Sequence, residues 1–273
     1  MQVGVSTASL FNRLPNEDAV AFLYEQGVPL AEVFLTSFSE YTAEFAALLN
    51  ERKKGLSVYS VHDLNTQFEP QLFAANDRVR KDAYSWLDKV MGAAKVLGAK
   101  RYTFHGTARV HRADHSGEND DFNRLGARLF AIVERCKMNG VGLCLENVEW
   151  ATYNRLGVFK ELKERVPDLL GVLDLKQARI SGFAWQEYLK EMGKDLSHVH
   201  VSDLSSNGKI CLPGKGAFNF GELVERLQGV GFNGPLIIET YSGDYDNLLE
   251  LKRACEYLQE LLYKKNCFTE NNF

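Results

Sequence analysis

The chain has 273 residues with 45% hydrophobic and 25% charged side chains, a composition that suits one large core in a soluble globular protein. Its formal net charge of −4 disfavours non-specific nucleic-acid binding, because neutralising phosphates requires an excess of Lys and Arg. No apolar run reaches the ~18 residues of a membrane span, and the first residues lack a signal-peptide pattern. Five cysteines without a CxxC pair indicate reduced thiols, so we expect a cytoplasmic protein.

Short apolar runs alternate with amphipathic stretches along the chain, which predicts strands separated by helices. Strands are expected at residues 3–6, 31–35, 57–62, 101–105, 142–146, 169–174, 198–202 and 236–239. Helices are expected at residues 17–26, 40–54, 77–97, 121–138, 156–165, 184–192, 219–228 and 245–264. Glycines that suit left-handed caps follow six of these helices, namely Gly27, Gly55, Gly98, Gly140, Gly193 and Gly231.

A helix between successive strands implies that the strands pair in parallel. Eight such units without a linker predict one closed (β/α)8 TIM barrel over residues 1–273, with a short polar tail from about residue 265. Long polar loops follow the third and fourth strands, at residues 63–76 and 105–120, whereas the turns after helices are short. This asymmetry places the working face at the carboxyl ends of the strands.

Acids and imidazoles stand at or near the carboxyl ends of the later strands. Glu146, Asp174, His200 and Glu239 come from four neighbouring strands, so their side chains should converge near the barrel axis. Any one of them alone also fits a charged strand end that is hydrogen-bonded to its own loop. Four together favour a metal site, because buried carboxylates need a counter-charge. Three carboxylates and one imidazole suit Mn²⁺, Mg²⁺, Co²⁺ or Zn²⁺.

The same strand ends resemble the xylose-isomerase-like barrels, which include sugar phosphate isomerases and epimerases, inosose dehydratases and the endonuclease IV DNA-repair enzymes. The resemblance covers residues 3 to about 263. It rests on YSVHD at His62, YTFHG at His105, LCLENVEW at Glu146, VLDLKQ at Asp174, HVHVSD at His200, LPGKGAFNF, and PLIIETY at Glu239. The order and spacing of these motifs are specific for the superfamily, but they do not specify a substrate.

The resemblance implies functions for four of these residues. In the ketose epimerases of this family, the positions that match Glu146, Asp174, His200 and Glu239 hold one divalent metal ion. The two glutamates there act as paired acid and base groups, so catalysis is assigned to Glu146 and Glu239. Mn²⁺ is the first choice of metal, with Co²⁺, Mg²⁺ and Zn²⁺ as alternatives. The expected partner is a sugar or polyol, and the chain is expected to form a homodimer or homotetramer.

The expected reaction is proton transfer at a carbon next to a carbonyl, through a metal-stabilised enediolate. Returning the proton to the same carbon gives an epimer, and returning it to the neighbouring carbon gives an aldose–ketose isomer. Loss of a β-hydroxyl group instead gives dehydration, as in the inosose dehydratases. The ligand set does not choose among these three outcomes.

Five further residues are predicted to bind substrate: His62, His105, Lys176, Trp150 and Lys209. His62 and His105 also match the first zinc pair of the endonuclease branch, so a second metal bridged by Glu146 stays open. Lys176 also fits a salt bridge to a neighbouring carboxylate. Trp150 and Phe11 could each stack on the apolar face of a sugar or simply cover the hydrophobic core. Lys209 and Lys215 could hold a substrate phosphate, and the alternative is that both are solvated loop lysines.

Two other functions compete with sugar isomerisation. An endonuclease-like phosphoesterase of the resembled branch would need a third zinc, yet Gln177 and the segment Lys209-Ile210-Cys211 stand where that branch has zinc ligands. The net negative charge also disfavours a DNA substrate. The other alternative is a barrel that binds a sugar without converting it, which the complete four-ligand set disfavours.

Overall fold

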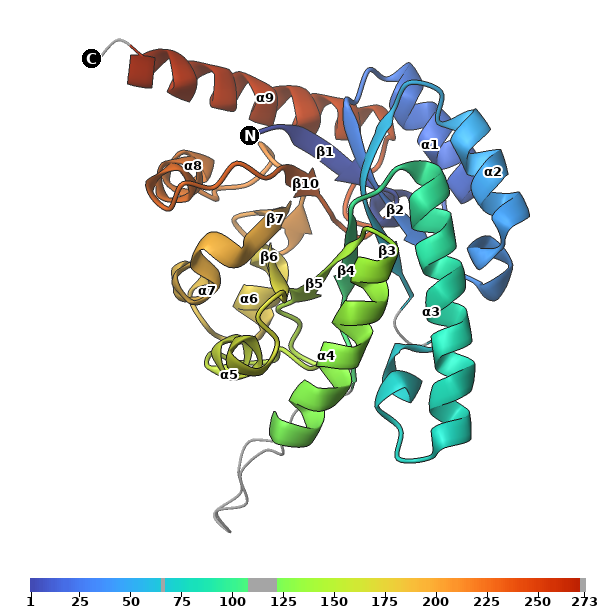
Figure 1. The fold of residues 1–273 in the computed structure, drawn as a ribbon. Coiled ribbons are helices and arrows are strands. Elements are labelled where there is room, and N and C mark those ends of the chain that lie inside the picture. Colours follow the sequence, from blue (N-terminus) through green and yellow to red (C-terminus); the bar gives the residue numbers. More distant parts are fainter. Residues whose placement is uncertain (65–66, 108–121, 271–273) are drawn as a thin grey trace.

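The structure, a computed structural model, describes residues 1–64, 67–107 and 122–270. Within these residues eight parallel strands close into a barrel in the order β1-β10-β7-β6-β5-β4-β3-β2 (Figure 1). The strands are β1 (Val3–Ser6), β2 (Leu30–Leu35), β3 (Ser57–Asp63), β4 (Arg101–Phe104), β5 (Gly142–Glu146), β6 (Leu170–Asp174), β7 (Leu196–Val201) and β10 (Leu236–Ile238). The predicted (β/α)8 barrel is confirmed.

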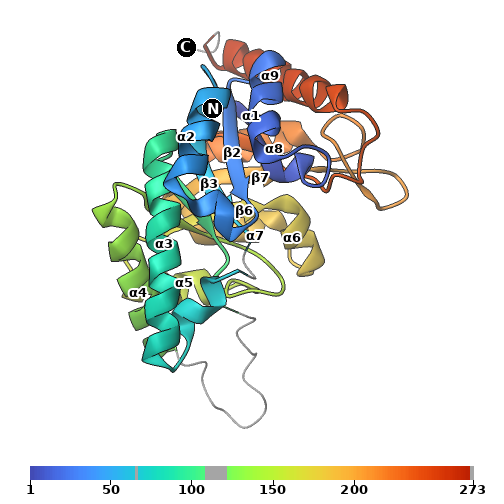
Figure 2. The same ribbon diagram turned by 90° about the vertical axis from the view of Figure 1, so that its right-hand side faces the viewer.

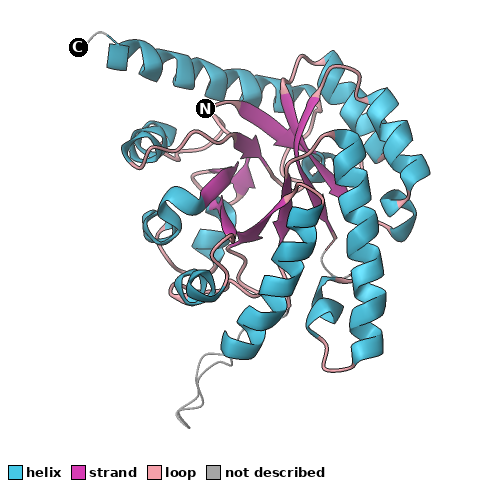
Figure 3. Cartoon of the chain, viewed as in Figure 1, coloured by secondary structure: helices cyan, strands magenta, loops and turns pink. Residues whose placement is uncertain are grey.

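The helices form a layer outside the strands (Figures 2 and 3). They are α1 (Asn16–Glu25), α2 (Ala43–Arg52), α3 (Asp77–Leu97), α4 (Phe122–Met138), α5 (Val158–Arg165), α6 (Leu175–Ile180), α7 (Trp185–Met192), α8 (Phe220–Gly229) and α9 (Leu249–Glu270). Short 3-10 helices lie at Thr7–Leu10, Phe38–Tyr41, Glu69–Phe73 and Gly193–Asp195. The last helix, α9, continues to Glu270, beyond residue 264 where we expected it to end. None of the described helices is long and apolar enough to cross a membrane.

The core lies between the barrel and this helical layer. All four residues of β1 and all six of β7 are buried, as parallel strands covered by helices require. On α3 the buried residues Leu87, Val90, Met91 and Ala94 recur at helical spacing, so one face of the helix packs on the barrel. The short apolar runs in the sequence therefore correspond to strands that are buried on both faces, and the amphipathic stretches correspond to helices that bury one face.

Two elements on the carboxyl side of the barrel were not predicted. Helix α6 begins directly after β6, and the segment that follows β7 folds into the antiparallel hairpin β8 (Asp203–Leu204) and β9 (Ile210–Cys211). One glycine cap is also wrong, since Lys54 rather than Gly55 takes the left-handed conformation, with φ 48°.

The buried Asp203 carboxylate organises the loop between the hairpin and α8. It accepts the backbone N–H groups of Leu204, Gly214, Gly216 and Phe218 at 2.7 to 3.0 Å. A Cβ atom on Gly216 would lie 2.2 Å from the carbonyl oxygen of Leu204, so only glycine fits there. A single carboxylate therefore holds this loop in place.

Candidate metal site and catalytic centre

The structure brings together the four residues predicted to bind the metal. One ligand atom from each of Glu146, Asp174, His200 and Glu239 lies within 4.8 Å of the others. Nδ1 of His200 is 3.0 Å from Oε1 of Glu146 and 3.9 Å from Oδ2 of Asp174, and it also contacts Oε2 of Glu239. The first three side chains are almost fully buried, and 12% of the Glu239 side chain is exposed. The cluster therefore opens to solvent beside Glu239.

The contacts inside this cluster suit a shared cation better than a closed set of hydrogen bonds. Oε2 of Glu239 is buried and makes no aligned hydrogen bond to any described residue, although it lies close to the His200 ring. Three carboxyl groups that face one imidazole nitrogen repel one another when ionised, and a shared cation would relieve that repulsion. These donors fit a divalent ion such as Mn²⁺, which prefers oxygen ligands with one imidazole.

The pKa values of the cluster show how the charges interact. Burial alone raises the pKa of Glu146, but attraction to His200 and hydrogen bonds from His105 and His200 hold it well below its usual range. Burial raises the pKa of Asp174 to about 7, against the opposing attraction of Lys176. Burial lowers the pKa of His200, yet the surrounding carboxylates, led by Glu239, raise it well above its usual value.

Local hydrogen bonds fix the position of Asp174 at the start of α6. Its Oδ1 accepts the backbone N–H of Gln177 at 2.7 Å, so Asp174 caps the helix. The side chain of Asn147 bonds both the backbone N–H and the carbonyl of Asp174, at 2.7 and 3.0 Å. Because Asn147 directly follows Glu146, it ties two of the four candidate ligands together across neighbouring strands. Sequence reasoning missed Asn147, although it stands inside the LCLENVEW motif.

His62 and His105 form a second cluster with Glu146. Nε2 of His62 lies 3.2 Å from Nε2 of His105, which lies 2.8 Å from Oε2 of Glu146. The Glu69 carboxylate accepts the backbone N–H groups of His105 and Gly106 at 2.9 and 2.7 Å, which fixes the end of the fourth strand. Both predicted histidines thus stand beside a predicted catalytic glutamate, on the side of the mouth away from Asp174.

Sequence reasoning also missed Glu32, which is fully buried in the middle of β2. Burial by itself raises the pKa of Glu32, but the charge of His200 and hydrogen bonds from three histidines outweigh burial and keep the pKa well below its usual range. The available signal was a single acid inside the apolar run LAEVFL. A charge in such a strand requires buried partners.

The other predicted substrate-binding residues have different surroundings. Lys176 reaches the site from the first turn of α6, with Nζ 3.9 Å from Oδ2 of Asp174 and 4.3 Å from the centre of the Tyr241 ring. The Trp150 ring lies 5.2 Å from the His105 ring and is 44% exposed.

The two loop lysines lie in the segment that follows β7. Lys209 is exposed in the β8–β9 hairpin, where its backbone bonds Ser205. Lys215 pairs with Glu250 at 3.0 Å.

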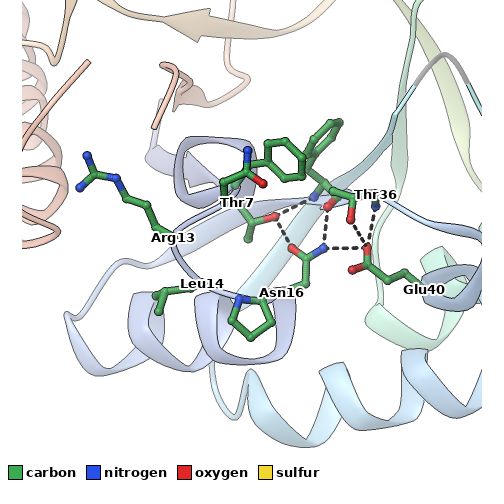
Figure 4. A pocket seen from close by; sticks show the side chains of 10 residues that line it. Thr7, Arg13, Leu14, Asn16, Thr36 and Glu40 are labelled. Carbon is green, nitrogen blue, oxygen red and sulfur yellow. Dashed lines mark hydrogen bonds between the residues drawn. The ribbon is translucent and has the colours of Figure 1, made fainter. Parts of the chain in front are cut away.

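A cavity of about 310 Å³ lies next to the cluster, between the loops that follow β1 and β2 (Figure 4). Phe34 lines this cavity and also contacts His62, with ring centres 4.9 Å apart, while Phe11 meets Phe34 edge-on. Oε2 of Glu40 accepts hydrogen bonds from the backbone and hydroxyl of Thr36 and from Asn16, at 2.6 to 3.1 Å. The cavity thus combines aromatic walls with a fixed carboxylate.

Metal binding is expected to release protons, because His200 and Asp174 hold protons that an ion displaces. The raised pKa of His200 keeps its ring protonated near neutral pH, and Asp174, with a pKa of about 7, is partly protonated there. The apparent affinity for Mn²⁺ should therefore rise between about pH 6 and about pH 8. Calorimetric titration of chelator-stripped protein in two buffers of different ionisation enthalpy would count the released protons. A pH-independent affinity with no proton release would contradict this prediction.

Comparison with known proteins agrees with this fold. A sequence profile described as xylose isomerase-like TIM barrel matches residues 18–261. An uncharacterized protein of Mycobacterium tuberculosis (strain H37Rv) is 24% identical in an alignment of 256 residues that covers 88% of this chain and 88% of that protein. A solved D-tagatose 3-epimerase-like protein has a TM-score of 0.77 at 21% identity, over 98% of this chain and 100% of that one. A probable 3-DHS dehydratase from Bacillus anthracis has a TM-score of 0.73 at 17% identity, over 95% and 99%.

At these identities, the likeness to the solved structures shows a shared fold. The family profile spans most of the chain, and the closed parallel barrel has the architecture that the family is named for. The chain therefore belongs to the xylose isomerase-like TIM barrel family.

Proposed function

We propose that this protein is a divalent-metal-dependent enzyme that epimerises or isomerises a sugar by moving a proton at a carbon next to a carbonyl. The observation that carries the proposal is the pair of glutamates, Glu146 and Glu239, that face the same nitrogen of His200 beside Asp174. A sugar bound at this cluster would have a carboxylate available on each side. The similarity to a D-tagatose 3-epimerase-like protein supports this reaction class.

In this proposal Glu146, Asp174, His200 and Glu239 hold the ion, which supplies Lewis-acid stabilisation of negative charge on the substrate oxygens. The pKa of Glu239 stays below its usual range because attraction to His200 outweighs the effect of burial. Glu146 and Glu239 are thus both carboxylates near neutral pH, and either one accepts the proton from carbon. The glutamate that does not accept it faces the other side of the substrate, where proton return inverts the configuration.

Neighbouring residues hold the acid and base groups in place. His105 contacts Oε2 of Glu146 at 2.8 Å, which orients that carboxylate. Attraction to Asp174 and Glu239 outweighs burial and raises the pKa of Lys176, so Lys176 is a fixed positive charge beside both carboxylates. Such a charge stabilises an oxygen that becomes negative in the transition state.

The cavity beside His62 supports a polyhydroxylated substrate. Phenyl rings offer apolar faces to the C–H groups of a sugar, and a fixed carboxylate accepts hydroxyl hydrogen bonds. The Glu40 carboxylate is fixed in this way, because three hydrogen-bond donors hold its Oε2 atom. The cavity therefore suits the non-reacting end of the sugar, with Phe34 between that end and His62.

A phosphoesterase with more than one metal is the second candidate, and one cluster favours it. His62, His105 and Glu146 also bring three donor atoms within 4.8 Å of one another. If both clusters took up zinc, Glu146 would belong to each, because it is a member of both.

The deciding experiment follows hydrogen exchange at carbon. Chelator-stripped protein is reloaded with Mn²⁺ and incubated in heavy water with ketohexoses, their phosphates and inososes, and products are read by mass spectrometry and chiral chromatography. We expect one ion per chain, and a deuteron at a carbon next to the carbonyl that depends on the ion. Loss of water from the substrate would identify a dehydratase, which the similarity to the probable 3-DHS dehydratase also allows. Zinc-dependent phosphodiester cleavage without carbon exchange would overturn the proposal.

A further inference from the structure

A buried carboxylate lies beneath the candidate metal site, on the far side of the His200 ring. Glu32 is 0% exposed and belongs to β2, three strands away from β7 in the closed strand order. In the register of the sheet it pairs with Ser6 on β1 and with Ser60 on β3. A carboxyl group in the barrel interior is costly unless hydrogen bonds or opposite charges surround it.

Three hydroxyl groups fix the orientation of this carboxylate. Oε2 of Glu32 accepts hydrogen bonds from Thr103 at 2.6 Å and from Ser60 at 2.7 Å. Oε1 accepts one from Ser6 at 3.1 Å. All three donors are fully buried, so the carboxylate has little freedom to turn.

The oxygen with a single hydroxyl partner faces two imidazoles. Oε1 of Glu32 lies 3.2 Å from Nε2 of His200 and 3.4 Å from Nδ1 of His62. Both nitrogens are buried and make no aligned hydrogen bond within the described part of the chain, and Oε1 of Glu32 is the carboxylate oxygen that lies within ion-pair distance of each. Each ring therefore has one buried nitrogen that lies against the Glu32 carboxylate, where a small turn of the ring would direct its N–H at Oε1.

The opposite nitrogen of each ring faces the candidate site. Nδ1 of His200 points at Glu146, and Nε2 of His62 lies 3.2 Å from Nε2 of His105. An imidazole that donates an N–H to a carboxylate keeps the lone pair of its other nitrogen for a metal or a substrate. One carboxylate is placed to impose this tautomer on both rings.

We propose that Glu32 is a positioning residue that holds the proton of His200 on Nε2 and the proton of His62 on Nδ1. His200 then presents Nδ1 to the divalent ion, and His62 presents Nε2 to the bound substrate. The metal part of this inference rests on the proposed function, but the assignment of the tautomers does not depend on which sugar reacts. A single residue thus couples the metal side of the mouth to the side lined by His62 and His105.

The first test needs no variant. Protein labelled with ¹⁵N-histidine and loaded with Zn²⁺ is studied by NMR correlations that distinguish the two ring nitrogens of each imidazole. We expect zinc on Nδ1 and the proton on Nε2 of His200, and the proton on Nδ1 of His62. Zinc on Nε2 of His200, a proton on Nε2 of neutral His62, or a failure to bind zinc would overturn the inference.

The second test measures metal affinity. Glu32→Gln keeps the side-chain shape but offers a weaker acceptor, so we expect the affinity for Mn²⁺ and Zn²⁺ to fall by about 10- to 100-fold. Glu260→Gln is the matched control, because it makes the same chemical change at an exposed position of α9. The control should keep the affinity and the tautomers of the parent. Equal affinity in Glu32→Gln and in the parent would contradict the inference.

Two further readouts separate this inference from a general loss of structure and from the proposed function. Circular dichroism reports whether Glu32→Gln folds, and if it does not fold, the tautomers of the parent decide the question. Parent protein that shows the expected tautomers and binds one ion, yet exchanges no sugar proton, would reject the proposed reaction and leave the role of Glu32 standing.

Discussion

Replacing Glu239 with glutamine is expected to lower kcat/KM for sugar interconversion by about 10³-fold or more, because general acid–base groups contribute roughly 10²- to 10⁴-fold and this residue is also a candidate metal ligand. Glutamine keeps the size of the side chain but removes the charge beside His200 and the basic oxygen. The measurement is the initial rate on the ketose that exchanges best in heavy water, at saturating Mn²⁺. The ion content of the variant is determined in parallel.

The exchange pattern makes this test sharper. If Glu146 and Glu239 serve opposite faces of the substrate, Glu239→Gln should still exchange the proton at one face while forming no epimer. Glu260→Gln is a matched control, because Glu260 is exposed on α9 and pairs only loosely with Lys264. A Glu239→Gln rate within about tenfold of the parent would show that this carboxylate is not an acid–base group.

Replacing Asp203 with alanine is expected to lower the free energy of unfolding by about 3–5 kcal/mol, because a hydrogen bond to a charged group contributes about 1.5–3 kcal/mol and four part-buried N–H groups lose that partner. The carboxylate accepts four backbone N–H groups that no other described side chain bonds. Water entering the relaxed loop recovers part of the loss, so the sum lies below four full penalties. Urea unfolding followed by circular dichroism measures the difference.

The variant Asp203→Asn refines this prediction. An asparagine keeps one acceptor oxygen, so its stability should lie between those of the parent and Asp203→Ala. Glu260→Ala removes an exposed acid and should leave the stability nearly unchanged. A loss below about 1 kcal/mol in Asp203→Ala would mean that the loop is held by other contacts.

Local pattern was sufficient to predict the barrel and the ends of its strands. Apolar runs that alternate with amphipathic stretches leave few architectures, since parallel strands need a crossover helix and a sheet buried on both faces. The positions of Glu146, Asp174, His200 and Glu239 near strand ends followed from the same runs. Once the barrel closes, groups at the carboxyl ends of neighbouring strands must approach one another, so the cluster could be predicted without coordinates.

Local pattern failed where a partner lies far away along the chain. Glu32 and His200 are 168 positions apart, and their contact depends on closure of the barrel and on register shifts beside Glu32 and Val172. The segment after Asp203 reads as a polar loop, because its order comes from a carboxylate that precedes it rather than from its own periodicity. Lys176 reaches the site from helix α6, which was not predicted.

The sequence by itself determined the fold class and the residues available at the mouth of the barrel, because both follow from interactions between residues close in the chain. The tertiary structure decided which buried groups contact those residues or hold the loops beside them, such as Glu32, Asn147 and Asp203. Hydrogen bonds to buried charges are short-ranged and directional, so their partners are set by the final register of the strands. That register is a property of the closed barrel, and no single segment contains it.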